Sequence, residues 1–177
     1  GGQHTMEERV EHIKASLPVA ARQVDPSCIQ LLAHAVSERR VPAGETITKE
    51  GDAGDSMHFM VKGLCCATLQ GRELERLPSG NCFGEVCLLQ YCRNIESGGS
   101  KGEVPEGCMR IASVVALQDS ILYELTAAAA HKILKTTPNM WVTLEQIAKQ
   151  RVRRSSEDAA EMEAMTKKMA QMPKSGP

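Results

Sequence analysis

An antiparallel β jelly roll flanked by helices, a fold of the α+β class, is the architecture that the sequence predicts. Three observations predict it. Between residues 39 and 125, glycine-containing turns recur at intervals of about eight to twelve residues, a spacing typical of a sandwich or barrel. The segments between these turns alternate in polarity or are rich in β-branched residues, as strands are. On both sides of this region, apolar residues recur at helical spacing.

The composition fits one such domain. The chain has 177 residues, of which 42% are hydrophobic and 24% charged, enough for one sizeable core. The net charge of -1 argues against a nucleic-acid partner, because phosphate backbones require an excess of Lys and Arg on one face. No apolar run reaches the roughly 20 residues that cross a bilayer, and no signal peptide opens the chain. We therefore expect a soluble, cytoplasmic segment without direct membrane insertion.

The cysteines and histidines do not form a recognisable metal or catalytic pattern. The 7 cysteines include no Cys-x-x-Cys pair, and their odd number predicts reduced, buried thiols rather than a disulfide framework or a zinc site. The 5 histidines are scattered along the chain, which argues against a jelly-roll enzyme. We expect no metal, no cofactor and no enzymatic activity.

Helices are expected before the jelly roll, over residues 6–38, after an expression remnant at residues 1–5. The first runs from Met6 to Ser16 and ends before Pro18. The second is capped by Asp25 and has Pro26 in its first turn. The apolar stripes of these two helices are Val10, Ile13 and Leu17, then Ile29, Leu32, Ala33 and Val36.

The jelly roll itself is assigned to residues 39–125. Each expected strand is a short aliphatic or alternating run between two glycine turns. These runs are residues 46–48, 57–61, 64–69, 74–77, 111–117 and 121–125.

Closing helices are expected over residues 126–154. Thr126 can cap the first, and Pro138 marks its end. The second, over residues 139–152, has one apolar face, with Arg151, Arg153 and Arg154 at its end, and is expected to cover the open mouth of the barrel. Residues 155–177 are assigned to a separate last helix and a disordered tail. The methionine stripe of that helix could be a coiled-coil seam, a partner site or a face packed on its own domain.

Residues 80–114 carry the functional signal. The run Gly80-Asn-Cys-Phe-Gly-Glu-Val-Cys-Leu-Leu89 places two glycines before an acid and an apolar run, which suits a tight loop opening a helix whose amides face an anion. The run Arg110-Ile-Ala-Ser-Val114 adds a fixed positive charge. Together they predict a pocket for a small phosphate ester, although a plain turn and a surface arginine remain the alternatives for each piece alone.

These residues resemble the cyclic-nucleotide-binding domain family, in particular the cytoplasmic domain of hyperpolarisation-activated and cyclic-nucleotide-gated ion channels. The similarity covers roughly residues 10 to 154. The matching pieces are Ser16-Leu-Pro18, Pro42-x-Gly44-Glu45-x-Ile47, Glu50-Gly51-Asp52, Met57-x-Phe59, Gly63, Phe83-Gly-Glu-Val-Cys-Leu-Leu89 and Arg110-Ile-Ala-Ser-Val114.

The resemblance implies a role for each site residue. Arg110 would pair with the phosphate, together with backbone amides from Glu85 to Cys87, and Glu85 would accept a hydrogen bond from the ribose 2′-hydroxyl. Arg151 and Arg154 would reach back from the closing helix to cap the purine. The residues implied to line the pocket around the sugar and base are Phe83, Gly84, Val86, Ala112, Ala67 and Leu77.

Two departures from the family pattern change these expectations. Residues 90–109 form an insertion before the arginine, which could bulge outward, act as a lid or bind a partner. Ile111 stands where cGMP-preferring members carry a threonine, so cAMP is favoured over cGMP.

The function implied is a regulatory domain in which bound cAMP or cGMP moves the C-terminal helices and gates an ion channel. The expected partners are the nucleotide and a covalently attached channel or other effector, with oligomers formed through the parent protein, at the cytosolic face of a membrane. The alternatives are a protein-interaction module of the same fold that binds no nucleotide, and a sensor domain of a kinase regulatory subunit.

Overall fold

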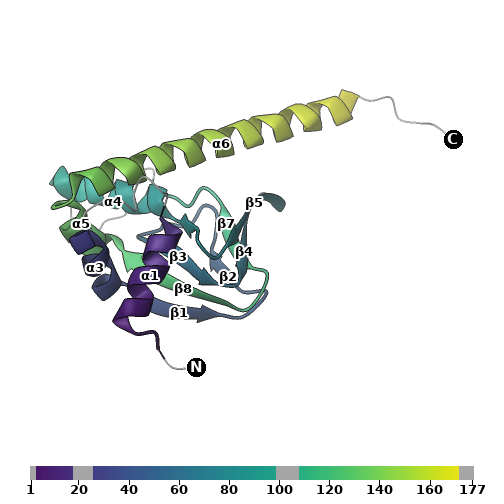
Figure 1. Ribbon diagram of the computed structural model, residues 1–177. Helices are drawn as coiled ribbons and strands as arrows, with labels where there is room; N and C mark the ends of the chain where they lie inside the picture. Colours follow the sequence, from purple (N-terminus) through teal and green to yellow (C-terminus); the bar gives the residue numbers. More distant parts are fainter. Residues whose placement is uncertain (1–2, 18–25, 99–107, 172–177) are drawn as a thin grey trace.

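Two four-stranded antiparallel sheets form the centre of the structure (Figure 1). The computed structural model describes residues 3–17, 26–98 and 108–171. The first sheet has the order β1 (Ser37–Val41), β8 (Ser120–Thr126), β3 (Ser56–Lys62) and β6 (Cys82–Phe83). The second has the order β2 (Thr46–Thr48), β7 (Ser113–Ala116), β4 (Leu64–Leu69) and β5 (Arg72–Pro78). This confirms the predicted antiparallel jelly roll with flanking helices.

The two sheets share one apolar core. Met60 and Leu122 of the first sheet pack with Cys65, Leu77 and Val114 of the second. The opposite face of the first sheet is covered by helices, so β3 is buried along its whole length except at Lys62. A strand with both faces covered explains why residues 56–62 are mostly apolar.

The strands differ from the predicted ones mainly at their ends. β1 was not predicted as a strand, because Ser37 to Arg40 are all polar and form an edge beside β8. β7 begins at Ser113 rather than at Ile111, since Ile111 and Ala112 form a bend. This bend leads from Arg110 into the second sheet.

The N-terminal helices pack against the helix-covered face of the first sheet. The helix α1 (Met6–Ser16) has the predicted bounds, and α3 (Pro26–Ala35) begins at the predicted proline. The predicted cap Asp25 lies outside the described residues. Thr5 caps α1 by accepting a hydrogen bond from Glu8 N, and His4 Nδ1 lies 2.6 Å from the Tyr123 hydroxyl. Residues 4 and 5, assigned to an expression remnant, therefore take part in the fold.

The C-terminal region contains α5 (Ala127–Leu134), capped by Thr126 as predicted, and α6 (Pro138–Gln171). α6 is one unbroken helix, so the prediction of separate helices before and after residue 155 was wrong. Neither Gly nor Pro occurs between residues 139 and 171, and two serines do not end a helix that is otherwise rich in good helix formers. The C-terminal half of α6 extends past the sheets in Figure 1, and Met165 and Met169 are exposed there.

The first half of α6 packs on helices rather than on the barrel mouth. Its residues Met140, Leu144 and Ala148 are buried in the cluster that contains Leu88 and Cys92 of α4 (Glu85–Glu96). Arg93 of α4 forms an ion pair of 3.1 Å with Glu145 of α6. The expected position over the mouth is therefore corrected to a position along α4.

All 7 cysteines are thiols and all are buried. Within the described ranges, no three His, Cys, Asp or Glu side chains are grouped so that they could hold a metal ion. Among the helices in those ranges, none has both the length and the apolar character that a membrane span requires.

Candidate functional site

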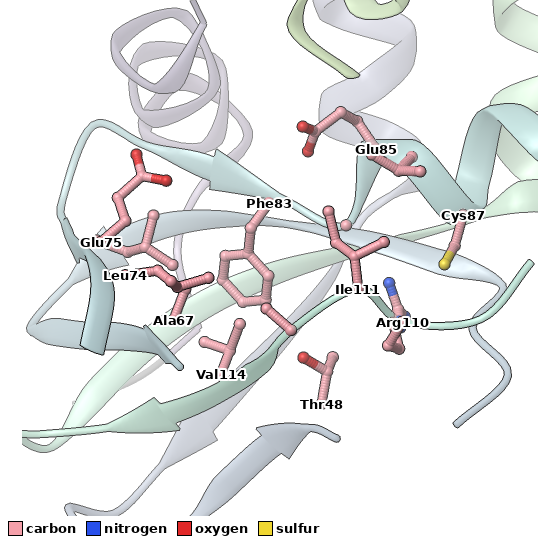
Figure 2. Close-up of a pocket in the computed structure, with 14 residues that line it drawn as sticks. Thr48, Ala67, Leu74, Glu75, Phe83, Glu85, Cys87, Arg110, Ile111 and Val114 are labelled. Carbon is pink, nitrogen blue, oxygen red and sulfur yellow. The ribbon is translucent and has the colours of Figure 1, made fainter. Parts of the chain in front are cut away.

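One hollow brings together the predicted site residues from distant parts of the chain. It occupies about 650 Å³, including the space at its open mouth, between the second sheet and the first turn of α4. Figure 2 shows the Phe83 ring in its middle, with Ala67 and Leu74 on one side and Cys87 and Arg110 on the other. The predicted residues that line it are Ala67, Leu77, Phe83, Gly84, Glu85, Val86, Cys87, Arg110, Ile111 and Ala112.

Four further lining residues were not predicted: Thr48, Leu74, Glu75 and Val114. Three of them follow from strand register once Ala67 is placed in the wall. Glu75 and Val114 are the partners of Ala67 on the neighbouring strands, and Thr48 is the partner of Val114. Cross-strand neighbours share a face of a sheet, so the register would have found them, but the register is not visible in a single sequence.

Arg151 and Arg154, the predicted purine contacts, are part of helix α6, but the structure describes only their backbone and not their side chains. None of the α6 side chains that are described lines the hollow. Their role therefore stays a prediction.

The first turn of α4 supplies one end of the hollow. Gly84 is the N-cap residue and has a left-handed backbone with φ of 88°, which Gly adopts without steric cost. Glu85 follows as the first helical residue and is 0% exposed. A helix N-terminus presents unpaired backbone N–H groups and the positive end of the helix dipole, which suits an anion.

α4 continues to Glu96 and thus includes the first seven residues of the predicted insertion. Residues 90–96 are therefore not a bulge. Leu88, Leu89 and Cys92 form its buried face, and Ser97 is the C-cap residue, followed by Gly98 with φ of 84°. A glycine in this conformation is a common C-terminal signal of helices. Residues 99–107 lie outside the described ranges.

Arg110 is held by the loop between β2 and β3. Its N–H donates to Asp52 O at 2.7 Å, and its carbonyl accepts from Gly51 N at 2.9 Å. The guanidinium donates from Nη1 to Ser56 O at 2.9 Å and from Nη2 to Ser56 Oγ at 3.3 Å. Gly54 makes room for it, because a Cβ there would lie 2.1 Å from Arg110 Nε. The Glu50-Gly51-Asp52 motif thus holds Arg110, the first residue of the Arg110–Val114 run, in place.

Phe83 is fixed from behind by His58 of β3. The two rings stack at 5.0 Å with an interplanar angle of 15°, and His58 Nε2 lies 3.0 Å from Glu124 Oε2. Burial lowers the pKa of His58, against the opposing effect of Glu124. The hydrogen bond from His58 in turn lowers the pKa of Glu124. The imidazole is therefore neutral at pH 7 and provides a flat, uncharged support for the Phe83 ring.

Comparisons with known proteins show which family the chain resembles. Residues 38–137 match the family model described as "Cyclic nucleotide-binding domain". The chain is 29% identical over 140 residues to the mouse potassium/sodium hyperpolarization-activated cyclic nucleotide-gated channel 3, a match that covers 79% of this chain and 16% of the channel. The match spans between 10% and 16% of the length of the curated channels that the chain matches.

Solved structures share the fold. One described as "cAMP bound PfPKA-R (141-441)" has a TM-score of 0.64 and 18% identity, covering 89% of this chain and 48% of that one. Another, described as "Sp-2Cl-cAMPS bound to PKAR CBD2", has a TM-score of 0.64 and 18% identity, covering 90% of this chain and 94% of that one. At these identities the likeness concerns the fold.

Proposed function

Because the chain belongs to the cyclic nucleotide-binding domain family, we propose that the hollow between α4 and the second sheet binds a cyclic nucleotide and controls an attached effector. One observation carries this proposal. Two sequence runs separated by about twenty residues meet in one hollow, and they place Arg110 and the N-terminus of α4 at the same end of it. Both features favour a small anion.

The phosphate is assigned to Arg110 and the first turn of α4. A guanidinium has five N–H donors in a planar fork, and Ser56 engages the fork from one side. The remaining donors can pair with a phosphate, assisted by backbone amides from Glu85 to Cys87. Ser56 thus acts as a positioning residue that sets the direction of the arginine before the ligand arrives.

The sugar and base are assigned to the rest of the hollow. Glu85, in the same turn as the phosphate amides, accepts a hydrogen bond from the ribose 2′-hydroxyl. The purine lies against the apolar wall that Phe83, Ala67 and Leu77 form. Arg151 and Arg154 of α6 cover its outer face. Pockets of this kind combine a mostly apolar lining with a few polar groups that fix the orientation of the ligand.

A calorimetric titration tests the binding proposal. We expect the chain to bind cAMP and cGMP, with cAMP tighter, and to bind 5′-AMP, in which the phosphate ring is open, much more weakly. Its phosphate carries a second negative charge, and the desolvation of that charge is not compensated by a single arginine. Heat of binding for cAMP, cGMP and 5′-AMP is measured on the same preparation. The absence of heat with both cyclic nucleotides would contradict the proposal and favour a protein-interaction module.

Nucleotide preference is assigned to Ile111, which lines the hollow and has no hydroxyl. We expect Ile111→Thr to raise the affinity for cGMP relative to cAMP by about 2- to 10-fold, since one hydrogen bond contributes about 0.5–1.5 kcal/mol. The matched control is Ile111→Val, which keeps a β-branched side chain but adds no donor. Parallel titrations of the two variants with cAMP and cGMP check this. If both variants changed the ratio of the two affinities equally, the effect would come from the shape of the side chain rather than from its hydroxyl.

The output of binding is assigned to the contact between α4 and α6. α4 begins at the hollow, and its buried face and Arg93 hold the first half of α6. A ligand that binds one arrangement of these helices better than another shifts their equilibrium, typically with about 1–3 kcal/mol of coupling. The effector is proposed to be an ion channel at the cytosolic face of a membrane, with a kinase assembly as the second candidate.

A further inference from the structure

Two cysteines meet at the point where the two halves of the hollow join. Cys87 lies in the first turn of α4, and Cys108 lies two residues before Arg110. The Cys108 thiol approaches Cys87 O at 3.2 Å and Gly54 O at 3.0 Å. Cys87 is 2% exposed and Cys108 0% exposed. The sulfur of Cys108 therefore packs directly on the backbone of Cys87.

The Cys87 and Cys108 thiols also influence each other's ionisation, and their environments differ. The hydrogen bond from the Cys108 thiol lowers the pKa of Cys87, and Arg110 adds to this effect, while burial and Glu85 oppose it. The same hydrogen bond and burial raise the pKa of Cys108. Cys87 is thus the more readily ionised thiol, and Cys108 is the protonated neighbour that stabilises its thiolate.

This pairing distinguishes Cys87 from other buried thiols of the chain. Burial raises the pKa of Cys65 and Cys66, and it raises that of Cys92 to about 12. Cys87 also lines the hollow, and Figure 2 shows its sulfur on the side of Arg110. The hollow is therefore the side from which a small uncharged molecule would approach Cys87.

We propose that Cys87 and Cys108 are a modification site, which a hydroperoxide oxidises to a disulfide that joins the two halves of the nucleotide-binding hollow. The Cys87 thiolate attacks one oxygen of hydrogen peroxide, the O–O bond breaks, and Cys87 becomes a sulfenic acid while the departing hydroxide takes up a proton as water. Cys108 sulfur then attacks the sulfenic sulfur. The S–S bond forms, the S–O bond breaks, and the Cys108 proton leaves with the hydroxyl group as a second water. Two thiols lose two electrons in total, and one peroxide is reduced to two waters.

Peptide mapping after peroxide treatment tests this directly. Trypsin releases Cys87 in the peptide of residues 77–93, together with Cys82 and Cys92, and releases Cys108 in the peptide of residues 102–110. We expect hydrogen peroxide to link these two peptides, with fragment ions assigning the bond to Cys87, and to remove two thiols per chain. A linkage through Cys82 or Cys92, or an unlinked 102–110 peptide after Cys87 has been oxidised, would overturn the proposal.

Serine variants separate the two roles. With Cys108→Ser, we expect no link and a sulfenic acid on Cys87 that dimedone traps. With Cys87→Ser, we expect neither the link nor dimedone labelling at residue 108. The control is Cys92→Ser, which changes another buried thiol in the same tryptic peptide and should form the link at the wild-type rate. Dimedone labelling of Cys108 in the Cys87→Ser variant would contradict the proposal, because it would show that Cys108 itself reacts with the peroxide.

One consequence rests on the proposed function. A cyclic nucleotide in the hollow covers Cys87, so saturating cAMP should slow formation of the link at least tenfold. Peptide mapping without nucleotide tests the Cys87–Cys108 disulfide and does not depend on nucleotide binding. Calorimetry tests nucleotide binding and does not depend on the thiols, so the failure of one proposal can be distinguished from the failure of the other. An unchanged rate of linkage in chain that calorimetry shows to be saturated would show that Cys87 is reached by another route.

Discussion

Arg110→Ala lowers the affinity for cAMP by a factor of roughly 30 to 4,000, because removing one member of a desolvated, hydrogen-bonded charge pair costs about 2–5 kcal/mol. Arg110→Lys keeps the positive charge but not the planar fork, so its affinity should lie between those of the wild type and the alanine variant. Isothermal titration at one ionic strength measures all three.

The control for this prediction is Arg76→Ala. Arg76 lies on β5, is exposed, and pairs with Glu73 at 2.8 Å outside the hollow, so the variant has the same change in net charge. Its affinity for cAMP should equal that of the wild type. If Arg110→Ala bound cAMP within twofold of the Arg76→Ala variant, the phosphate would not lie at Arg110.

Gly84→Ala destabilises the domain by about 3 kcal/mol or more and also weakens nucleotide binding. A left-handed backbone costs a non-glycine residue about 1–2 kcal/mol. In addition, a Cβ on Gly84 would lie 2.8 Å from both Ser56 O and Arg110 Nη1, and 3.1 Å from Met57 Cα. Two of these atoms belong to the backbone of β3, which cannot move freely because both of its faces are buried.

Gly44→Ala separates the two contributions, since Gly44 has φ of 90° but no atom within 4 Å of the added Cβ. This variant should lose only about 1–2 kcal/mol and bind cAMP normally. Equilibrium unfolding in urea gives the free energy of unfolding of both variants. If Gly84→Ala and Gly44→Ala lost the same free energy of unfolding, the first turn of α4 would tolerate the close contacts of the added Cβ.

The sequence predicted those parts of the fold that depend on local pattern. The bounds of α1, the cap at Thr126 and the strands between glycine turns follow from spacing and capping residues within a few positions of each other. The C-terminal end of α4 and the continuity of α6 past residue 155 were missed. In both cases the composition of the sequence changes at that point, but no helix-breaking residue stands there.

Most of the residues that line the hollow were predicted, but their contacts with one another were not. The resemblance carried Arg110, Glu85 and the lining residues, whereas nothing local links Arg110 to Ser56 across more than fifty positions. The stacking of His58 on Phe83 depends on the pairing of β3 with β6, which is likewise set by tertiary structure. Contacts of this kind arise from register and packing, which one sequence does not display.

The length of α6 means that a small tilt of this helix moves its C-terminal end by a large distance. The helix has 34 residues, and its described buried residues end at Ala148, so about 35 Å of helix extends beyond that point at 1.5 Å per residue. If α6 pivots where it contacts α4, a tilt of the helix by about 10° would displace its C-terminal end by about 6 Å. A sub-ångström shift where Arg93 meets Glu145 is thus enlarged at the far end, where the side chains of Met165 and Met169 face solvent.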